Sequence, residues 1–330
     1  MAINTITRAF TLSVLSVAPA TAQEVLTVAY FQEWPMPFQY AKSKGIYDEK
    51  LGISVNWVAF DSGTAMSAAM AAGDVQIALS QGVPPFIVAV SAGQDLRVVD
   101  IAAAYTDNDN CVVAARLEIN KDSATELTGK RVALPVGTIA HYGFLQQMKH
   151  FGVDPASMTI VDMAPAEAAA AFDQGSIDMA CGWGGALSRM KENGNVLLSG
   201  AEKESAGILA FDLTTTTAQF AAEQPETLSD FLAVTAEMNA MWNAGDQRDE
   251  MLPVIAQDAG MDVADAGAVI DNFQFLTPQE QLSETWLGDR VSGYFHGVAT
   301  MFYELGNIPA VLPDYARFIE LTPLRNVDGR

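Results

Sequence analysis

The sequence predicts an α/β protein of two lobes, each built on a mostly parallel sheet that is flanked by helices. Short segments rich in β-formers alternate with segments whose apolar residues recur at helical spacing, and Gly-containing joints separate them. This alternation runs through the chain twice, and a mostly helical region follows it. A chain of 330 residues also exceeds the length that one hydrophobic core usually supports, which favours two lobes.

Lobe 1 is expected to take its sheet from the first round of the alternation. The strands expected there are 25–30, 53–58, 75–79 and 96–103, and the helices are 38–44, 62–72 and 84–92. The second round is expected to form lobe 2. Its expected strands are 111–115, 129–134, 158–163, 177–183 and 212–217, and its expected helices are 141–151 and 165–174.

The C-terminal region is expected to wrap back over lobe 1. Apolar residues at three-to-four spacing predict helices at 225–244, 248–259, 263–273 and 279–305. The chain then crosses between the lobes twice, near 106–110 and near 214–218, and these crossings are expected to form a hinge. The expected division is lobe 1 at 23–108 and 216–330, and lobe 2 at 109–215.

Residues 1–22 are typical of a secretory signal peptide. Arg8 precedes an apolar stretch at 9–18, and Ala20-Thr21-Ala22 forms a small-x-small cleavage site. The apolar stretch is too short to span a bilayer core, which needs about 20 residues. No cysteine follows the cleavage site directly, so the sequence predicts secretion without a lipid anchor and without membrane insertion.

The chain is strongly acidic, with 40 Asp and Glu residues against 18 Lys and Arg residues and a formal net charge of −22. A charge of this sign repels nucleic acids and anionic membranes, so neither is expected as a partner. The charge leaves the nature of a ligand open, because a local pocket can differ in character from the surface.

Two cysteines, Cys111 and Cys181, form either one disulfide or two buried thiols. Secretion favours oxidation. The inferred sheet order makes their strands neighbours, but a disulfide also needs a suitable register, which the sequence does not reveal. Both alternatives therefore stay open, and the spacing carries no metal signature.

Several short motifs occur in an order that is similar to that of a known family. They are Phe60-Asp61-Ser62-Gly63, 73–77 (Gly-Asp-Val-Gln-Ile), 129–135 (Gly-Lys-Arg-Val-Ala-Leu-Pro), His141-Tyr142, 175–178 (Gly-Ser-Ile-Asp), Trp183 and Leu276-Thr277-Pro278-Gln279. Together they resemble the taurine and aliphatic sulfonate binding proteins of ABC importers, over nearly the whole mature chain. The resemblance implies a type II periplasmic-binding fold, in which two lobes close over a ligand like a hinged trap.

The resemblance also implies a function. The protein is expected to be a monomer in the periplasm that carries a small sulfonate, taurine first, to an ABC transporter permease, with no cofactor and no catalysis. Alternatives that stay open are a binding protein for another small zwitterion or anion, such as an amino-carboxylate or an alkanesulfonate, and a carrier of a pyrimidine precursor of thiamine. A secreted enzyme on the same fold is a further class, and it would need a nucleophile, a base or a metal that converge.

A helix start in lobe 2 is the expected site for the anion. The segment 134–141 ends a strand in a Gly-containing turn and opens a helix, whose first N–H groups have no partner within the helix and carry partial positive charge. The resemblance places the ligand there at Thr138, Ala140 and His141. The family often has two hydroxyl residues before the histidine, whereas this chain has Ile139 and Ala140, so one hydroxyl contact is in doubt. The alternative is that Thr138 only caps its own helix.

Ser80, Gln81 and Gly82 end the third strand of lobe 1 at another helix start. The carboxyl ends of strands face the crevice in a doubly wound sheet, so we expect these residues to contact the same anion from the opposite lobe. Gln81 stands where the family has a small residue, which implies a reshaped pocket. The alternative is a turn whose polar residues are hydrated by solvent.

The other end of a zwitterion needs a counter-ion and a shaped wall. Asp212, near the second crossing, is expected to pair with an ammonium group, with Glu33 as a second candidate. Trp34 and Trp183 are expected to present aromatic faces that attract a cation and exclude water. The alternatives are that Asp212 only holds backbone groups of the hinge and that the tryptophans only pack within the lobes.

No catalytic or metal site is expected. The chain has three histidines, and no serine-nucleophile motif or aspartate is placed to work with them. His141 is therefore expected to donate to the anion or to cap its helix. Residues 107–110 (Asp-Asn-Asp-Asn) are rich in oxygen ligands but lack the Gly and the terminal Glu of a calcium loop, so they are expected to form a solvated loop between the lobes.

Overall fold

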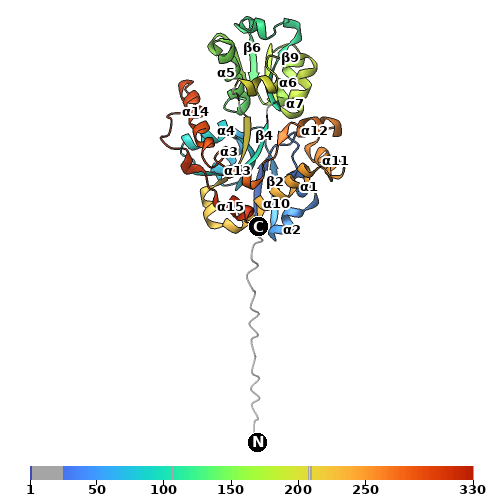
Figure 1. Ribbon diagram of the computed structural model, residues 1–330, viewed down its shortest axis with the longest axis vertical. Helices are drawn as coiled ribbons and strands as arrows, with labels where there is room; N and C mark the ends of the chain where they lie inside the picture. The colour runs from blue at the N-terminus through green and yellow to red at the C-terminus, as the bar shows by residue number, and fades with distance from the viewer. Residues whose placement is uncertain (2–24, 106, 207, 209, 330) are drawn as a thin grey trace.

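The computed structural model describes residues 1, 25–105, 107–206, 208 and 210–329, and Figure 1 shows them as a larger lobe below and a smaller lobe above. Each lobe has its own sheet, which confirms the predicted α/β class with two sheets. Apart from Met1, the expected signal peptide at 1–22 lies outside the described residues.

The larger lobe, lobe 1, is built on a six-stranded sheet in the order β11-β4-β10-β3-β1-β2. Its strands are β1 Val25–Tyr30, β2 Ser54–Ala59, β3 Ile77–Gly82, β4 Leu96–Tyr105, β10 Ala210–Thr217 and β11 Phe273–Gln274. Strand β1 runs parallel to β2 and β3. Strand β10 runs antiparallel to β3 and β4, and β11 runs antiparallel to β4.

The smaller lobe, lobe 2, is built on a five-stranded sheet in the order β7-β6-β8-β5-β9. Its strands are β5 Asp109–Ala114, β6 Arg131–Leu134, β7 Thr159–Asp162, β8 Met179–Trp183 and β9 Gly194–Val196. Strand β6 runs parallel to β7 and β8, whereas β5 runs antiparallel to β8 and β9.

Helices cover both sheets (Figure 1). Those of lobe 1 are α1 Phe38–Lys44, α2 Ile46–Leu51, α3 Gly63–Ala72, α4 Val83–Ser91, α9 Ala218–Glu223, α10 Pro225–Ala244, α11 Arg248–Ala259, α12 Val263–Ile270, α13 Pro278–Gln281, α14 Arg290–Glu304 and α15 Thr322–Asp328. Those of lobe 2 are α5 Ile139–Phe151, α6 Pro165–Asp173, α7 Gly184–Glu192 and α8 Gly200–Ser205. Short 3-10 helices lie at Ala115–Leu117, Lys121–Leu127, Pro155–Ser157 and Ala316–Phe318.

Four strands of each sheet run in the same direction, which confirms the prediction of mostly parallel sheets, although each sheet also contains antiparallel strands. The strands that run against their neighbours include β5 and β10, and each is the first strand after the chain has passed from one lobe to the other. A strand that enters its sheet from the other lobe does not complete a β-α-β crossover, so the alternation in the sequence does not require it to be parallel.

Strand β10 also corrects the expected lobe boundary. It pairs with β3 and β4 along Ala210–Thr217, so residues 210–215, assigned from the sequence to lobe 2, lie in the sheet of lobe 1. The chain therefore returns to lobe 1 before Ala210 rather than at 214–218. The β-forming residues of this segment predict a strand, but they do not say which sheet it joins.

The structure also corrects one predicted helix and adds several short elements that were not predicted. The helix expected at 279–305 is broken into α13 and α14. Gly288 lies in the turn between them, and a Cβ atom there would lie 2.7 Å from the backbone oxygen of Ser283, so this tight turn requires glycine. The sequence analysis did not identify the short elements α2, α7, α8, α9, α15, β9 and β11.

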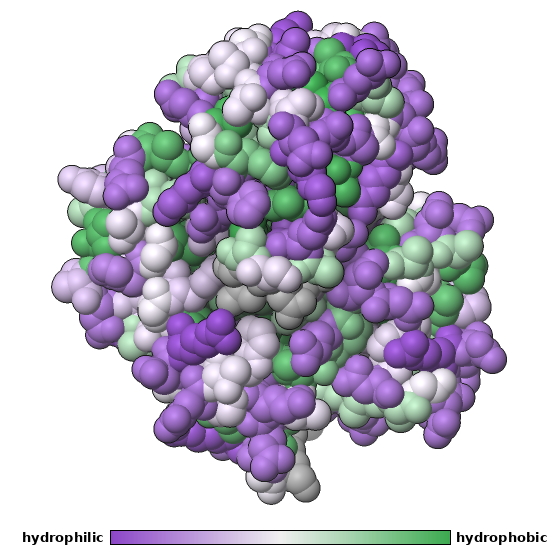
Figure 2. Space-filling view, turned by 45° about the horizontal axis from the view of Figure 1, so that its top comes forward, coloured by the Kyte–Doolittle hydropathy of each residue, from purple (hydrophilic) through white to green (hydrophobic). Residues whose placement is uncertain are grey.

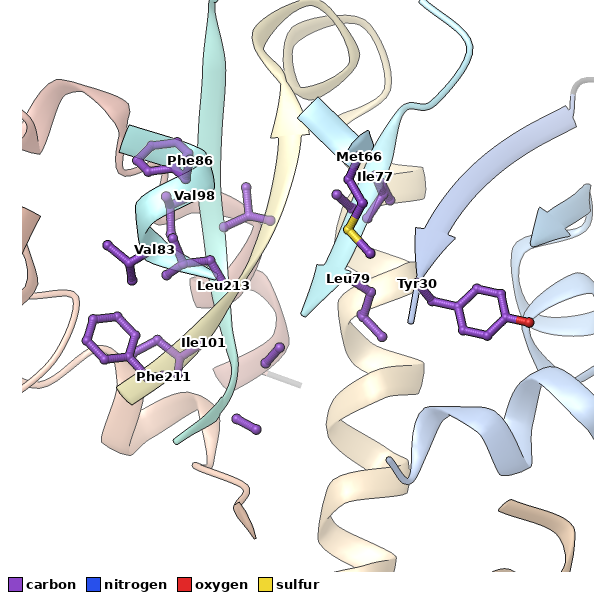
Figure 3. Packing of buried hydrophobic residues seen from close by; sticks show 14 of the residues in the cluster. Tyr30, Met66, Ile77, Leu79, Val83, Phe86, Val98, Ile101, Phe211 and Leu213 are labelled. Atoms are coloured by element: carbon purple, nitrogen blue, oxygen red, sulfur yellow. The ribbon is translucent and has the colours of Figure 1, made fainter. Parts of the chain in front are cut away.

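Lobe 1 buries one large hydrophobic cluster. Figure 3 shows Phe86 of α4 beside Val98 of β4, and Val83 of α4 beside Leu213 of β10, and all four belong to the same cluster. Buried residues of α10, α14 and α15 join this cluster as well. The expectation that the C-terminal helices cover lobe 1 is therefore confirmed.

Each face of the lobe 2 sheet carries its own apolar cluster, because successive residues of β5 point to opposite faces. Cys111 of β5 and Cys181 of β8 are direct partners in the antiparallel register. A disulfide of 2.04 Å joins their sulfur atoms. The register, which the sequence does not reveal, places the two cysteines opposite each other. They therefore form a disulfide rather than two buried thiols.

The face of the molecule in Figure 2 is covered mostly by hydrophilic residues, with apolar residues scattered among them. Among the described residues, every helix is too short or too polar to cross a lipid bilayer.

Candidate functional site

A narrow pocket lies between the two lobes. Lobe 1 contributes Phe31, Trp34, Gly63, Gly82, Pro85, Tyr105 and Asp212, and lobe 2 contributes Asp109, Thr138, Ile139 and Trp183. A larger hollow shares Tyr105 as a wall, but only lobe 1 lines it among the described residues. A second hollow between the lobes shares Phe31 and Trp183 with the pocket, but it lies beside Glu33 and Pro165 and does not reach Asp212 or the start of the helix at Ile139. The pocket lined by Asp212 and Thr138 is therefore the candidate site.

The lobes are in contact beside the pocket. A Cβ atom on Gly82 of lobe 1 would lie 3.5 Å from Cβ of Ile139 in lobe 2. Gly184 begins α7 with φ of +54°, and a Cβ atom there would lie 2.1 Å from the backbone oxygen of Glu33 in lobe 1. Only glycine permits that approach. The structure is thus a closed arrangement of the lobes.

Asp212 provides a buried carboxylate at the lobe 1 side of the pocket. The residue is 2 % exposed. Its Oδ1 accepts a hydrogen bond of 2.9 Å from the hydroxyl of Tyr105, and its Oδ2 accepts one of 2.7 Å from Ser80. The pairing of β10 with β4 shifts register directly after Asp212, and such irregularities re-aim side chains next to sites. Burial raises the pKa of Asp212 to about 7, although the hydrogen bonds from Ser80 and Tyr105 partly oppose this rise.

Ser80 and Trp34 hold the Asp212 carboxylate. The indole N–H of Trp34 donates to Oγ of Ser80 at 2.9 Å, and the serine hydroxyl donates onward to Asp212. Ser80 has φ of 64°, in the left-handed region that costs a residue other than glycine on the order of 1 kcal/mol. The proton of Ser80 is therefore committed to Asp212, and Ser80 positions the carboxylate rather than lining the pocket.

Aromatic rings form the walls of the pocket. Trp34 packs edge-to-face on Tyr105 with 5.3 Å between ring centroids, and it is 3 % exposed. Trp183, at the end of β8, lies 5.7 Å from the ring of Phe31. The structure therefore brings both sequence-predicted tryptophans to the pocket, one from each lobe.

The start of α5 faces the pocket from lobe 2. Thr138 is its N-cap, and the threonine hydroxyl accepts from the N–H of His141 at 3.5 Å and donates to the oxygen of Pro135 at 2.6 Å. The hydroxyl proton is therefore used within the turn. The N–H groups of Ile139 and Ala140, in the first helical turn, have no acceptor within the helix and are the donors for an anion. Ala140 can act only through its backbone, because its side chain lies in the lobe 2 core.

Helix α4 of lobe 1 offers fewer donors than α5. Gly82 is its N-cap and lines the pocket, but Pro84 and Pro85 occupy its first turn and have no N–H. The two sides of the pocket thus differ in chemistry. Lobe 2 supplies most of the backbone donors, whereas lobe 1 supplies the Asp212 carboxylate.

His141 supports the turn before α5 instead of lining the pocket. Its Nδ1 accepts a hydrogen bond of 3.2 Å from the N–H of Gly137, and its ring lies 5.6 Å from that of Phe302. Burial lowers the pKa of His141 to about 4. The imidazole is therefore neutral at pH 7 and carries its proton on Nε2.

Two other sequence-predicted ligand residues are engaged outside the pocket. Gln81 is fully buried, and its amide donates to the oxygen of Gly63 at 3.0 Å and accepts from the hydroxyl of Thr215 at 2.8 Å. It ties β3 to α3 and β10. Glu33 forms an ion pair of 3.3 Å with Arg189 of α7, and its side chain is 41 % exposed. This pair joins the lobes at the surface.

Tyr105 and Asp109 line the pocket, and the sequence analysis missed both. They end β4 and begin β5, on the two sides of the first crossing. The prediction of a solvated loop at 107–110 is wrong for three of its four residues, because Asn108 is 4 % exposed, and Asp109 and Asn110 lie in β5 and are 6 % and 2 % exposed. A signal was present in the sequence, since polar residues that flank a crossing lie at strand ends that face the cleft.

The pocket therefore has two ends of opposite character, which suit a small zwitterion. The helix-start donors can bind an anion, and the Asp212 carboxylate, between aromatic walls, can bind a cation. Among the described residues there is no group of three or more side chains of the kind that hold a metal ion.

Comparisons with known proteins agree with this architecture. The model of the family described as NMT1/THI5 like matches residues 35–245. The chain is 29 % identical over 312 residues to the taurine-binding periplasmic protein of Escherichia coli strain K12, which covers 93 % of this chain and 95 % of the relative.

Solved structures show the same fold. The alkanesulfonate-binding protein SsuA from Xanthomonas axonopodis pv. citri, bound to MOPS, has a TM-score of 0.74 at 19 % identity and covers 91 % of this chain and all 100 % of its own. The aliphatic sulphonate binding protein SsuA from Escherichia coli has a TM-score of 0.71 at 22 % identity and covers 90 % of this chain and 97 % of its own. The type II periplasmic-binding fold expected from the sequence is thereby confirmed.

Proposed function

This chain belongs to the NMT1/THI5-like family, and we propose that it is a solute-binding protein that captures a small sulfonate, taurine first, for an ABC importer. A sulfonate-binding role is supported by relatives whose names state taurine or aliphatic sulfonate binding. The choice of taurine rests on the pocket itself.

One observation carries the choice of taurine: the buried carboxylate of Asp212 lines the same closed pocket as the start of α5. A sulfonate at the α5 start accepts hydrogen bonds from the N–H groups of Ile139 and Ala140, and the ammonium of the same molecule pairs with Asp212. An alkanesulfonate without an amine satisfies only the first of these ends. It would leave a buried carboxylate without a counter-ion, which is unfavourable.

We propose that the pocket binds its ligand without changing it. Of the described residues that line it, Thr138 alone carries an aliphatic hydroxyl, and that hydroxyl donates to the backbone oxygen of Pro135. His141 lies outside the lining and uses Nδ1 on Gly137. The hydroxyl of Tyr105 donates to Asp212, but burial raises its pKa well above the ordinary value, so it stays protonated. The lining thus offers no activated serine, threonine or tyrosine nucleophile.

The remaining parts of the proposal concern location and partners. We propose that residues 1–22 direct secretion to the periplasm, where the mature chain works as a monomer and docks on an ABC transporter permease. The two lobes are proposed to hinge at the connections after Tyr105 and before Ala210, because these connections join the two sheets.

Mass spectrometry of the ligand released from denatured protein tests the proposal. We expect taurine to be released, and calorimetric titration of ligand-free protein to show tighter binding of taurine than of ethanesulfonate. Release of a thiamine-precursor pyrimidine, or binding of β-alanine in preference to taurine, would overturn the assignment to a sulfonate.

A further inference from the structure

We infer that Asp109 is a second carboxylate for the cation of the ligand, opposite Asp212, and that this pair selects ligands that carry a primary ammonium group. The inference rests on the proposed function and goes further, because it names a specificity-determining residue on lobe 2. It also states why the amine, rather than the sulfonate, decides which ligand is accepted.

The placement of Asp109 carries the inference. Asp109 begins β5, is 6 % exposed and lines the pocket. Its Oδ2 is buried and has no hydrogen-bond partner. A buried oxygen without a partner is costly, so a ligand that donates to it gains affinity. Because Asp109 lines the pocket, a ligand amine that enters the pocket comes next to this carboxyl group.

The charges around Asp109 leave room for a cation. Lys203 of α8 is buried nearby, but its ammonium donates to the backbone oxygen of Asp109 at 2.5 Å and forms no ion pair with the carboxylate among the described residues. Burial raises the pKa of Asp109, the positive charge of Lys203 opposes this rise, and the charge of Asp212 adds to it. When both carboxyl groups are ionised, two carboxylates and one ammonium leave one negative charge. A singly charged cationic ligand compensates it.

Other ionisable groups nearby do not supply this compensation. Asp107 forms an ion pair of 3.5 Å with Lys191 at the surface, so that pair is balanced within itself. Tyr105 donates its hydroxyl to Asp212, and burial raises its pKa well above the ordinary value, so it stays neutral. The uncompensated charge therefore belongs to the pair of Asp109 and Asp212.

The geometry favours a primary ammonium. A primary ammonium has three N–H donors, so it can donate to both carboxylates while the rest of the molecule extends toward α5. A quaternary ammonium has no N–H and leaves Oδ2 of Asp109 without a partner. Asp212 lies on lobe 1 and Asp109 on lobe 2, so the cation would also hold the lobes together.

Calorimetric titration of the Asp109→Asn variant tests the inference, with Asp107→Asn as the matched control two residues away. Taurine and β-alanine carry the amine, and ethanesulfonate and propionate are their amine-free partners. For Asp109→Asn at about pH 8 we expect the affinity for taurine to fall by about tenfold or more, while the affinity for ethanesulfonate changes by less than about threefold. Asp107→Asn should change neither by more than about twofold.

Each outcome separates the two proposals. If the wild type prefers taurine and Asp109→Asn keeps the same ratio of taurine to ethanesulfonate affinity, the inference is wrong and the proposed function stands. If the wild type binds β-alanine instead of taurine, the proposed function is wrong, and the ratio of β-alanine to propionate tests Asp109 in the same way. Binding of none of the four ligands overturns both.

Partial misfolding of a variant does not change the ratio of its affinities for taurine and ethanesulfonate, because both affinities are measured on the same preparation and their ratio is independent of the fraction of active protein. If the amide of Asn prevents folding, Asp109→Ser removes the charge with a smaller side chain and is read by the same ratio.

Discussion

The hydroxyl of Ser80 donates a hydrogen bond of 2.7 Å to Oδ2 of Asp212, and this contact joins the end of β3 to β10 beside the pocket. Ser80 in turn accepts from the indole of Trp34. The carboxylate is therefore held by a chain of neutral donors, which orients it without neutralising its charge. The affinity for a cationic ligand, the stability of Ser80 variants and the pH dependence of stability should all depend on this arrangement.

Asp212→Ala should weaken taurine far more than ethanesulfonate. The carboxylate pairs only with the ammonium, and loss of a buried charge partner costs on the order of 2–5 kcal/mol. Calorimetric titration with both ligands measures the difference. Asp100→Ala is the matched control, because Asp100 is a buried carboxylate of the same sheet that is held by Thr214 and Gln281 and does not line the pocket. Equal losses for both ligands in Asp212→Ala would show that Asp212 only shapes the hinge.

Ser80→Ala and Ser80→Gly should separate the hydrogen bond from the backbone strain. Both variants lose the donor to Asp212, so both should bind taurine about fivefold more weakly. Glycine adopts φ of 64° without strain, so the free energy of unfolding of Ser80→Gly should exceed that of Ser80→Ala by about 1 kcal/mol. Denaturant unfolding of the two variants measures this difference. Identical stabilities would contradict the strain at this position.

The stability of the ligand-free protein should depend on pH through Asp212. Its folded-state pKa of about 7 lies above the ordinary value of 3.8, so the folded state holds more protons than the unfolded state between these values. The stabilising contribution is complete below the ordinary value and is lost as the pH rises through about 7. Thermal unfolding from about pH 4 to pH 8 should therefore show a smaller decline for Asp212→Asn than for the wild type. Parallel curves would show that Asp212 does not titrate in this range.

Gly184→Ala should hold the lobes apart. Its Cβ atom would lie 2.1 Å from the backbone oxygen of Glu33, so the closed contact could not form. Small-angle scattering with saturating taurine should show a decrease in the radius of gyration for the wild type and a smaller decrease for the variant. Gly143→Ala in α5 is the control, because a Cβ atom there meets nothing within 4 Å. Full closure of Gly184→Ala would contradict the contact.

Replacement of Cys111 and Cys181 by alanine should lower the free energy of unfolding by about 2–4 kcal/mol. The disulfide closes a loop with a sequence separation of 70, and its loss frees the unfolded chain. Denaturant unfolding measures the change. Alkylation of denatured, unreduced wild type should label no thiol, whereas two labelled thiols would show that the bond does not form in solution.

Much of the fold could be predicted because its signals are local. Strand β1 at Val25–Tyr30 and helix α1 at Phe38–Lys44 match the expected residues, since alternating β-formers and a helix-ending Gly45 act within a few residues. The positions of β5 and β10 in their sheets could not be predicted, because strand order depends on contacts between segments far apart in the sequence.

The residues of the candidate site that could be predicted are large aromatic or charged residues at strand ends, because such residues have few other roles there. Trp34, Trp183 and Asp212 were singled out as large aromatic or charged residues at strand ends, and they line the pocket. Gln81 was singled out as a donor to the anion and Glu33 as a second partner for the cation, but partners in distant elements hold them. Asp109 was missed because its burial depends on β5 entering the sheet beside β8.

The sequence by itself determined the two-lobed α/β class, the acidic character and the resemblance to sulfonate-binding proteins, because each follows from composition or from the order of short motifs. Only the tertiary structure decided which polar groups meet. Closure of the lobes places Asp109, Asp212 and the start of α5 around one pocket. Folding within each lobe commits Ser80, Gln81 and His141 to supporting hydrogen bonds. The physical reason is that a buried polar group must find a partner, and its partner here lies on another element or on the other lobe.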